Sequence, residues 1–160
     1  MIIRVAAVRD GLDVGHHGGA DAARRAVEVV GPVAWVVDGA GFLKDGKSSP
    51  GVVRQYSGTL GKVADCQIGV SVHSVTDTAP CPLGWRLYLP RSWDDQAVDE
   101  ADQPEVAARR ESCGVPEDER HRPKWSLVVE MLDELAHHGL HPPLPAATPA
   151  TGNSASSTAP

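Results

Sequence analysis

Positive charge is scarce in this sequence of 160 residues, in which 15 Lys and Arg residues are outnumbered by 21 Asp and Glu residues and the formal net charge is −6. Proteins that bind nucleic acid on their own usually carry a basic face. The short basic groups that do occur, such as Arg24-Arg25 and the segment from Arg120 to Lys124, have acidic neighbours. Solvated surface charge is the simpler interpretation of such groups. Strong autonomous binding to nucleic acid is therefore not expected.

Paired cysteines and long apolar runs are also lacking. Cys66, Cys81 and Cys113 are far apart and odd in number, and no secretory signal precedes them. We therefore expect reduced thiols in the cytoplasm. No two of these cysteines have the short spacing of zinc ligands. No stretch of about 18 apolar residues occurs, so the sequence predicts no membrane-spanning helix.

The patterns that are present predict an α/β fold. Apolar runs and alternating apolar residues predict strands over residues 33–37, 52–56, 67–75 and 85–89. Helix-forming segments predict helices over residues 20–30, 105–112 and 123–138. The last of these is the clearest, with Pro123 in its first turn, Gly139 at its end and an apolar stripe on one face. The predicted stripe consists of Trp125, Val128, Val129, Leu132, Leu135 and Ala136.

Four strands followed by an amphipathic helix resemble the start of an RNase H-like domain, an antiparallel β-meander with a helix packed across it. We expect residues 31–141 to form this incomplete domain, preceded by an N-terminal remnant over residues 1–30 that contains a loop and a short helix. Residues 142–160 have almost no apolar bulk. We expect them to be a disordered C-terminal tail, in place of the parallel strand that the complete fold needs next.

Asp38 is the first candidate functional residue, because it directly follows the apolar strand predicted over residues 33–37. Strand ends are where α/β proteins gather the side chains that bind ligands. An aspartate in front of a glycine, here Gly39, also commonly caps a turn. The residues alone leave these two interpretations evenly balanced.

Residues Gly41–Ser48 form a second candidate site, because they satisfy the phosphate-loop pattern G-x-x-x-x-G-K-[ST] by letter. In such a loop Lys47 would contact the nucleotide phosphates and Ser48 would contact magnesium. The loop also needs a helix to begin near Lys47, but the segment from Pro50 to Val53 is a poor helix former. Because the pattern matches but the helix is not predicted, we keep nucleotide binding by a small P-loop-like protein as the alternative function, not the first.

Longer blocks of the sequence resemble one family. The segment from Val36 to Gly46 resembles the first catalytic block of DDE-type insertion-sequence transposases, in which an apolar strand delivers an aspartate. Five later segments resemble the following blocks of that family in the same order, namely residues 49–62, 66–73, 85–95, 109–116 and 121–140. The resemblance covers about residues 20–141. It implies that the chain is a C-terminally truncated fragment of a DDE superfamily endonuclease.

The family resemblance also implies a function. Its members cleave and join DNA strands with two magnesium ions held between carboxylates and the scissile phosphate. Asp38 would then be the first catalytic carboxylate and a Mg²⁺ ligand, and transposon-end DNA would be the partner of the intact enzyme. The apparent phosphate loop would be an accident of letters, because the family places Lys-Gly at this point for other reasons.

Three departures from the family pattern imply that this fragment is inactive. The family has an acidic residue and Thr after its first aspartate, where this sequence has Gly39 and Ala40. The family supplies its second aspartate from a strand ending in Ala-Asp-x-x-Tyr-Gly and later a glutamate, but no acid follows Glu134 here. Most of the N-terminal region that recognises DNA ends is also lacking. We therefore expect weak or absent DNA binding, and self-association or association with a full-length transposase through uncovered surfaces.

Overall fold

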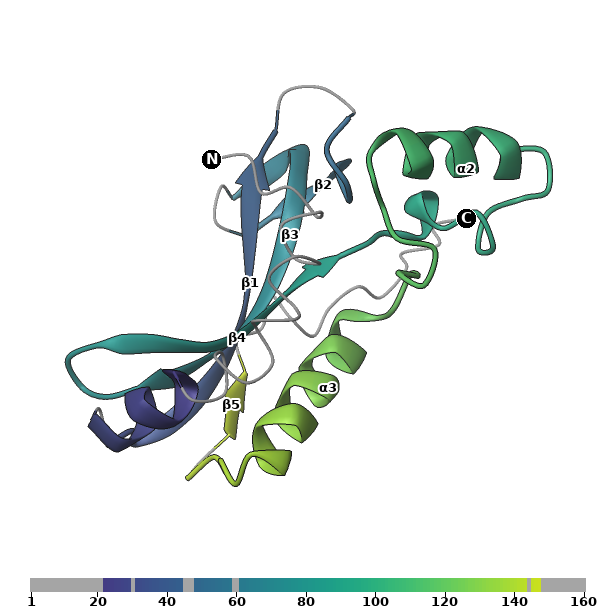
Figure 1. Ribbon diagram of the computed structural model, residues 1–160. Coiled ribbons are helices and arrows are strands. Elements are labelled where there is room, and N and C mark those ends of the chain that lie inside the picture. Colours follow the sequence, from purple (N-terminus) through teal and green to yellow (C-terminus); the bar gives the residue numbers. More distant parts are fainter. Residues whose placement is uncertain (1–21, 30, 45–47, 59–60, 144, 148–160) are drawn as a thin grey trace, which may run out of the picture.

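The computed structural model describes residues 22–29, 31–44, 48–58, 61–143 and 145–147 (Figure 1). Residues 22–29 are helical, as predicted for that part of the first helix. The other elements are β1 (Ala34–Leu43), β2 (Val53–Ser57), β3 (Lys62–Val75), β4 (Pro80–Tyr88), the 3₁₀ turn η1 (Arg91–Trp93), α2 (Gln103–Ser112), α3 (Lys124–His137) and β5 (Pro145–Ala147). The predicted α/β class is confirmed, and the arrangement is consistent with an RNase H-like fold.

β3 is the central strand of the sheet. Its 14 residues pair with β1 along one edge, and with β2 and then β4 along the other edge. All three pairings are antiparallel. The predicted meander is confirmed along the path β1, β3, β4, whereas β2 is a short partner of β3 and does not lie between β1 and β3. β3 accepts both β2 and β4 because it is longer than either.

The main core lies between the sheet and α3, which runs along one side of the sheet (Figure 1). Side chains alternate between the two faces of a strand, so Trp35 and Val37 of β1 point to the same face as Val70 and Val72 of β3. All four are buried. The other buried members of this cluster come from the helical segment 22–29, from α3 and from the chain just beyond the end of α3, namely Ala23, Leu127, Met131, Leu135 and Leu140.

The apolar stripe predicted for α3 is only partly right, because Leu135 is buried and Val128 and Leu132 pack against the core, whereas the rest of the buried face differs from the prediction. The residues buried against the sheet are Leu127, Met131 and Leu135, spaced four apart. Trp125 is 67% exposed and Val129 is 48% exposed. α3 carries apolar residues around more than half of its circumference, so the helical period alone is compatible with two buried faces. Contact with the sheet selected the face that contains Met131, which lies close to Gly84 of β4.

The prediction that residues 142–160 are all disordered is wrong for residues 145–147. These residues form β5, which pairs in parallel with Trp35, Val36 and Val37 of β1. Composition missed this strand because it is stabilised by backbone hydrogen bonds to the edge of β1, which do not require large side chains. Its first residue is Pro145, a position where a strand tolerates proline. Residues 148–160 lie outside the described residues.

The boundaries of α2 and α3 agree closely with the predicted helices. Gly139 ends α3 as predicted, with a positive φ of 75° and an amide that donates to the carbonyl of Ala136. The amide of Leu140 bonds back to Leu135, a pattern that glycine favours at helix ends. No helix in the described part of the chain is long and apolar enough to cross a membrane.

A small lobe lies beyond the end of β4 and contains η1, α2 and the loop from α2 to α3 (Figure 1). Leu89, Trp93 and Val115 form its buried apolar cluster. The indole Nε1 of Trp93 donates to the backbone carbonyl of Val52 at 2.8 Å. That bond fastens the lobe to the turn before β2, so the lobe and the sheet are packed together.

Candidate metal-binding and catalytic site

Asp38 lies in the middle of β1, within the strand and not after its end. Trp35 and Val37 point into the core, so the alternation of a strand turns Asp38 to the opposite face of the sheet, where its side chain is exposed. The amide of Gly39 donates to Asp38 Oδ1 at 2.8 Å. The strand thus presents a carboxylate to solvent and orients it through the next peptide group.

The residues around Asp38 come from β1 and β3 and share its side of the sheet, which we call the Asp38 face. It consists of Val36, Asp38 and Ala40 of β1 and Gly69, Ser71 and His73 of β3. Ser71 stands directly opposite Asp38 in the antiparallel register. Its hydroxyl makes a long 3.5 Å contact to the Asp38 carbonyl and lies 2.9 Å from His73 Nε2. Sequence reasoning did not find Ser71 or His73, because cross-strand register is not visible in a single strand's pattern.

β5 lies beside Asp38 on the edge of β1 opposite to β3. Its described residues end at Ala147, which pairs with Val37, one position before Asp38. A strand parallel to β1 therefore occupies the place where the sequence resemblance expects the strand that delivers a second acid. In the described part of the chain, no group of three His, Cys, Asp or Glu side chains gathers to hold a metal ion.

Comparison with known proteins agrees with this geometry. A family model described as "DDE superfamily endonuclease" matches residues 20–147, which is most of the chain. The chain belongs to the DDE superfamily endonucleases. The match extends through β5, six residues beyond the resemblance that ended at residue 141, and this agrees with the observed parallel strand.

One curated relative of the chain is the "Probable transposase for insertion sequence element IS701" of Microchaete diplosiphon. The two are 32% identical over 113 residues, which is 65% of this chain and 30% of the relative. The chain thus spans less than a third of the length of that transposase. No solved structure matches it significantly. The predicted resemblance to DDE-type insertion-sequence transposases is confirmed.

The alternative phosphate-loop site does not have the geometry that it needs. Gly41 lies within β1 and pairs with Ile68 of β3. A turn over residues 49–51 leads into β2, where a phosphate loop would need a helix. Residues 45–47 lie outside the described residues, but strands on both sides of them replace the strand–loop–helix arrangement. The match of this segment to the phosphate-loop pattern is therefore coincidental.

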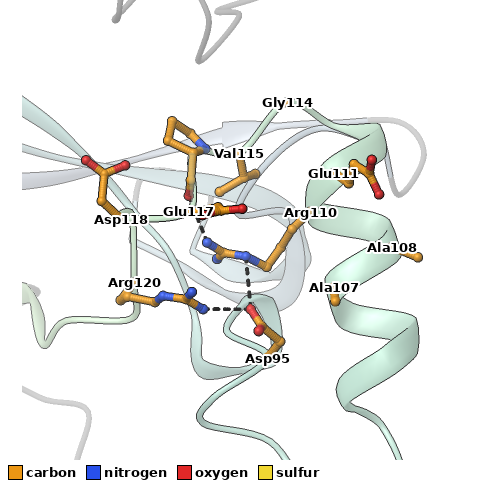
Figure 2. Close-up of a pocket in the computed structure, with 11 residues that line it drawn as sticks. Asp95, Ala107, Ala108, Arg110, Glu111, Gly114, Val115, Glu117, Asp118 and Arg120 are labelled. Carbon is orange, nitrogen blue, oxygen red and sulfur yellow. Dashed lines mark hydrogen bonds and ion pairs between the residues drawn. The ribbon is translucent and has the colours of Figure 1, made fainter.

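A cleft of about 1160 Å³ lies in the small lobe, well separated in sequence from Asp38. Figure 2 shows Arg110 and Arg120 converging on Asp95 at its centre. Arg110 Nε lies 3.2 Å and Arg120 Nη1 lies 2.7 Å from the same Asp95 oxygen. Arg110 is only 4% exposed and also donates to the carbonyls of Trp93, Pro116 and Glu119. These bonds occupy the guanidinium, so we assign the network a structural role.

Asp94 is the second acid of the lobe and is 5% exposed. Burial raises the pKa of its carboxyl, but hydrogen bonds from the His121 and Gln96 amides and from Arg120 outweigh burial and lower this pKa overall. The carboxylate therefore stays charged and tethers the loop before α3. The sequence carries no local signal for this network, because its members are separated by up to 27 positions.

The three cysteines, all within the described residues, form no disulfide. Cys66 is fully buried in β3, as expected for a small core residue. Burial raises the pKa of the Cys66 thiol, and the nearby positive charge of Lys124 opposes that increase only in part. A protonated, inaccessible thiol is a poor nucleophile, so Cys66 is not a catalytic candidate.

Proposed function

We propose that this chain carries the first carboxylate of a metal-dependent site for DNA strand cleavage and transfer. Asp38 would be a catalytic residue and a ligand of a divalent ion such as Mg²⁺. The observation that carries the proposal is the exposed Asp38 carboxylate on the face of a sheet whose β1 is flanked by antiparallel β3 and parallel β5. Transposon-end DNA would be the substrate of the complete enzyme, as the name of the relative suggests.

The residues of the chain would position this carboxylate. The Gly39 amide orients Asp38 through Oδ1, and pairing with β3 keeps its backbone in a rigid strand. Carboxylate oxygens are the ligands that Mg²⁺ prefers in proteins. A bound divalent ion would activate the attacking oxygen or stabilise the leaving oxygen at the scissile phosphate.

We further propose that these 160 residues alone do not catalyse strand transfer. Mg²⁺ sites for phosphate chemistry use one or two carboxylates together with substrate phosphates, and two ions need several ligands in register. Asp38 supplies a single carboxylate, and no acid follows Glu134 in the sequence. Positioning provides most of the catalysis in phosphoryl transfer, so one ligand is not sufficient.

Metal binding at Asp38 can be tested with Mn²⁺ as a paramagnetic probe of the amide NMR signals. We expect selective broadening of the signals of Gly39 and Ser71, which neighbour the carboxylate. The affinity should be on the order of millimolar, as for sites with few charged ligands. The variant Asp38→Asn should abolish the effect, whereas Asp77→Asn, at an exposed position in the β3–β4 turn, should leave it unchanged. Equal broadening in Asp38→Asn would contradict the assigned ligand.

The absence of strand transfer is tested by a nicking and joining assay with Mg²⁺ and duplexes that carry the terminal repeats flanking the gene. We expect no product above background from the 160-residue chain. Robust Mg²⁺-dependent cleavage that disappears in Asp38→Ala would refute the proposed inactivity, although it would support the role of Asp38.

Self-association remains a prediction. The exposed Trp125 and Val129 provide apolar surface on the outer side of α3, which is consistent with association but does not identify the partner. Sedimentation velocity across a range of chain concentrations would decide it. A single monomeric species at every concentration would show that this surface does not drive self-association.

A further inference from the structure

Trp85 of β4 points to the same side of the sheet as the Asp38 face, two strands away from Asp38. The antiparallel registers align Asp38 of β1 with Ser71 of β3, and Ser71 with Trp85 of β4. The three residues thus form one row across the sheet and point to the same side. Neighbouring strands are about 4.8 Å apart, so the Cα atoms at the two ends of this row are separated by roughly 10 Å.

Gly69 leaves room for the indole of Trp85 above the central strand β3. A Cβ atom at Gly69 would lie 2.3 Å from Trp85 Nε1 and 2.6 Å from Cε2, so the indole occupies the space directly above this glycine. Gly69 belongs to the central strand and pairs with Ala40 of β1. The indole therefore extends from β4 over β3, with its Nε1, Cε2 and Cζ2 atoms above Gly69.

The other three tryptophans, all within the described residues, differ from Trp85 in this respect. Trp35 is buried in the main core, and Trp93 is buried in the small lobe with its Nε1 bonded to a carbonyl. Trp125 is exposed on α3, on the opposite side of the sheet. Trp85 is partly exposed, and its Nε1 makes no hydrogen bond to any residue that the structure describes. Its ring is an aromatic surface that the fold leaves accessible beside the proposed site.

We propose that Trp85 is a positioning residue that stacks on a nucleobase of the DNA strand whose phosphate reaches Asp38. This inference rests on the proposed function. Aromatic side chains on the open face of a sheet are effective stacking surfaces for the bases of single strands. The distance between Asp38 and Trp85 is one that a few nucleotides of one strand span.

The charge of the chain makes stacking the more important source of affinity. Binding through phosphate contacts needs Lys and Arg side chains and weakens steeply as salt increases. This chain has a net charge of −6, and the six residues of β1 and β3 that make up the Asp38 face include one carboxylate and no Lys or Arg. Base stacking does not depend on a basic surface. Oligonucleotide binding at this face should therefore depend only weakly on salt and tolerate changes in base sequence.

The test measures fluorescence anisotropy of a labelled single-stranded oligonucleotide titrated with the 160-residue chain. Trp85→Leu, which keeps apolar bulk but removes the ring, should weaken binding roughly tenfold, the range of one lost stacking contact. Trp85→Phe keeps a ring and should restore most of the affinity. Trp125→Leu, on the other side of the sheet, is the matched control and should have no effect. Circular dichroism spectra establish that each variant is folded.

A second measurement separates stacking from a merely structural role of Trp85. A series of oligonucleotides, each with one abasic position, is titrated with the wild-type chain and with Trp85→Leu. At the base that stacks on the indole, removing the base should weaken wild-type binding about tenfold and leave Trp85→Leu unaffected, because the contact is already lost. At all other positions the two changes should be additive.

Additive losses at every abasic position, or equal binding by wild type and Trp85→Leu, would overturn the inference. Failure of the wild-type chain to bind the oligonucleotide at all would also overturn it. These results are distinguishable from failure of the proposed function, because stacking on Trp85 is expected with or without Mn²⁺. Broadening by Mn²⁺ that depends on Asp38 would support the metal site even if the Trp85 result is negative.

Discussion

Replacement of Arg110 by methionine should strongly destabilise the small lobe and the chain with it. Arg110 is 4% exposed and connects three parts of that lobe. It donates to the carbonyl of Trp93 at 2.8 Å, to Pro116 at 2.9 Å and to Glu119 at 2.6 Å, and it forms an ion pair with Asp95. Methionine preserves most of the apolar stem but removes every donor.

The expected size of the effect follows from what is left behind. Three carbonyls lose a donor, and a buried group without its partner costs about 1–3 kcal/mol. Removing one partner of a buried ion pair costs about 3–5 kcal/mol. Asp95 is 26% exposed at its side chain and keeps Arg120 at 2.7 Å, which moderates the loss. We therefore expect destabilisation by about 3 kcal/mol, a large share of the 5–15 kcal/mol that is typical of a domain.

Urea denaturation followed by circular dichroism measures this free energy of unfolding. Arg91→Met is the matched control, because Arg91 is an exposed arginine of the same lobe with one long 3.3 Å bond to Ala97. That variant should lose less than about 1 kcal/mol. The reasoning is refuted if Arg110→Met unfolds at the same urea concentration as Arg91→Met. Hydrogen exchange of the 113–119 amides would then show whether the lobe stays closed without the guanidinium.

Three further predictions concern other parts of the fold. The pKa of Asp94 is lowered in the folded chain. The stabilisation that its carboxylate provides is therefore present above the pKa of the unfolded chain and is lost as pH falls through the lower pKa of the folded chain. Below about pH 4 the wild type should lose stability more steeply than Asp94→Asn, which urea titrations at several pH values measure. Gly41→Ala should lower the free energy of unfolding by about 1–3 kcal/mol, because the added Cβ would lie 2.2 Å from the hydroxyl of the buried serine that ends β2. Gly39→Ala should be nearly neutral, because its Cβ would meet nothing within 4 Å. Similar thermal midpoints for the two variants would contradict this expectation. Met131→Ala should lower the free energy of unfolding by about 2–5 kcal/mol, because Met131 is 1% exposed. Trp125→Ala should cost much less, because Trp125 is 67% exposed. The reverse order would indicate that the face of α3 that contains Trp125 is the buried one.

Local patterns predicted the elements well because those patterns act over neighbouring residues. Alternating apolar residues in the segment 67–75 predicted the second part of β3, which begins earlier at Lys62, and the turn at Gly139 predicted the end of α3. The continuous apolar run before Asp38 predicted β1 and identified that residue as the candidate carboxylate, although β1 continues through Asp38 to Leu43. The likeness of successive blocks predicted the family. These conclusions needed only the order and spacing of residues along the chain.

Contacts between segments that are distant in sequence decided the rest. α3 has apolar residues on two adjoining faces, and only packing against the sheet selected Leu127 and Met131 over Trp125. β5 is held by backbone hydrogen bonds to the edge of β1, which are nearly independent of side-chain type.

The surroundings of Asp38 also depended on tertiary structure. The sequence by itself placed the Asp38 carboxylate next to an apolar strand, and the tertiary structure extended that strand through Asp38. The registers of β3 and β4 decided that Ser71 and Trp85 stand beside it. A strand's own alternation specifies which face a residue occupies, but the identity of its cross-strand neighbours depends on pairing between segments far apart in the chain.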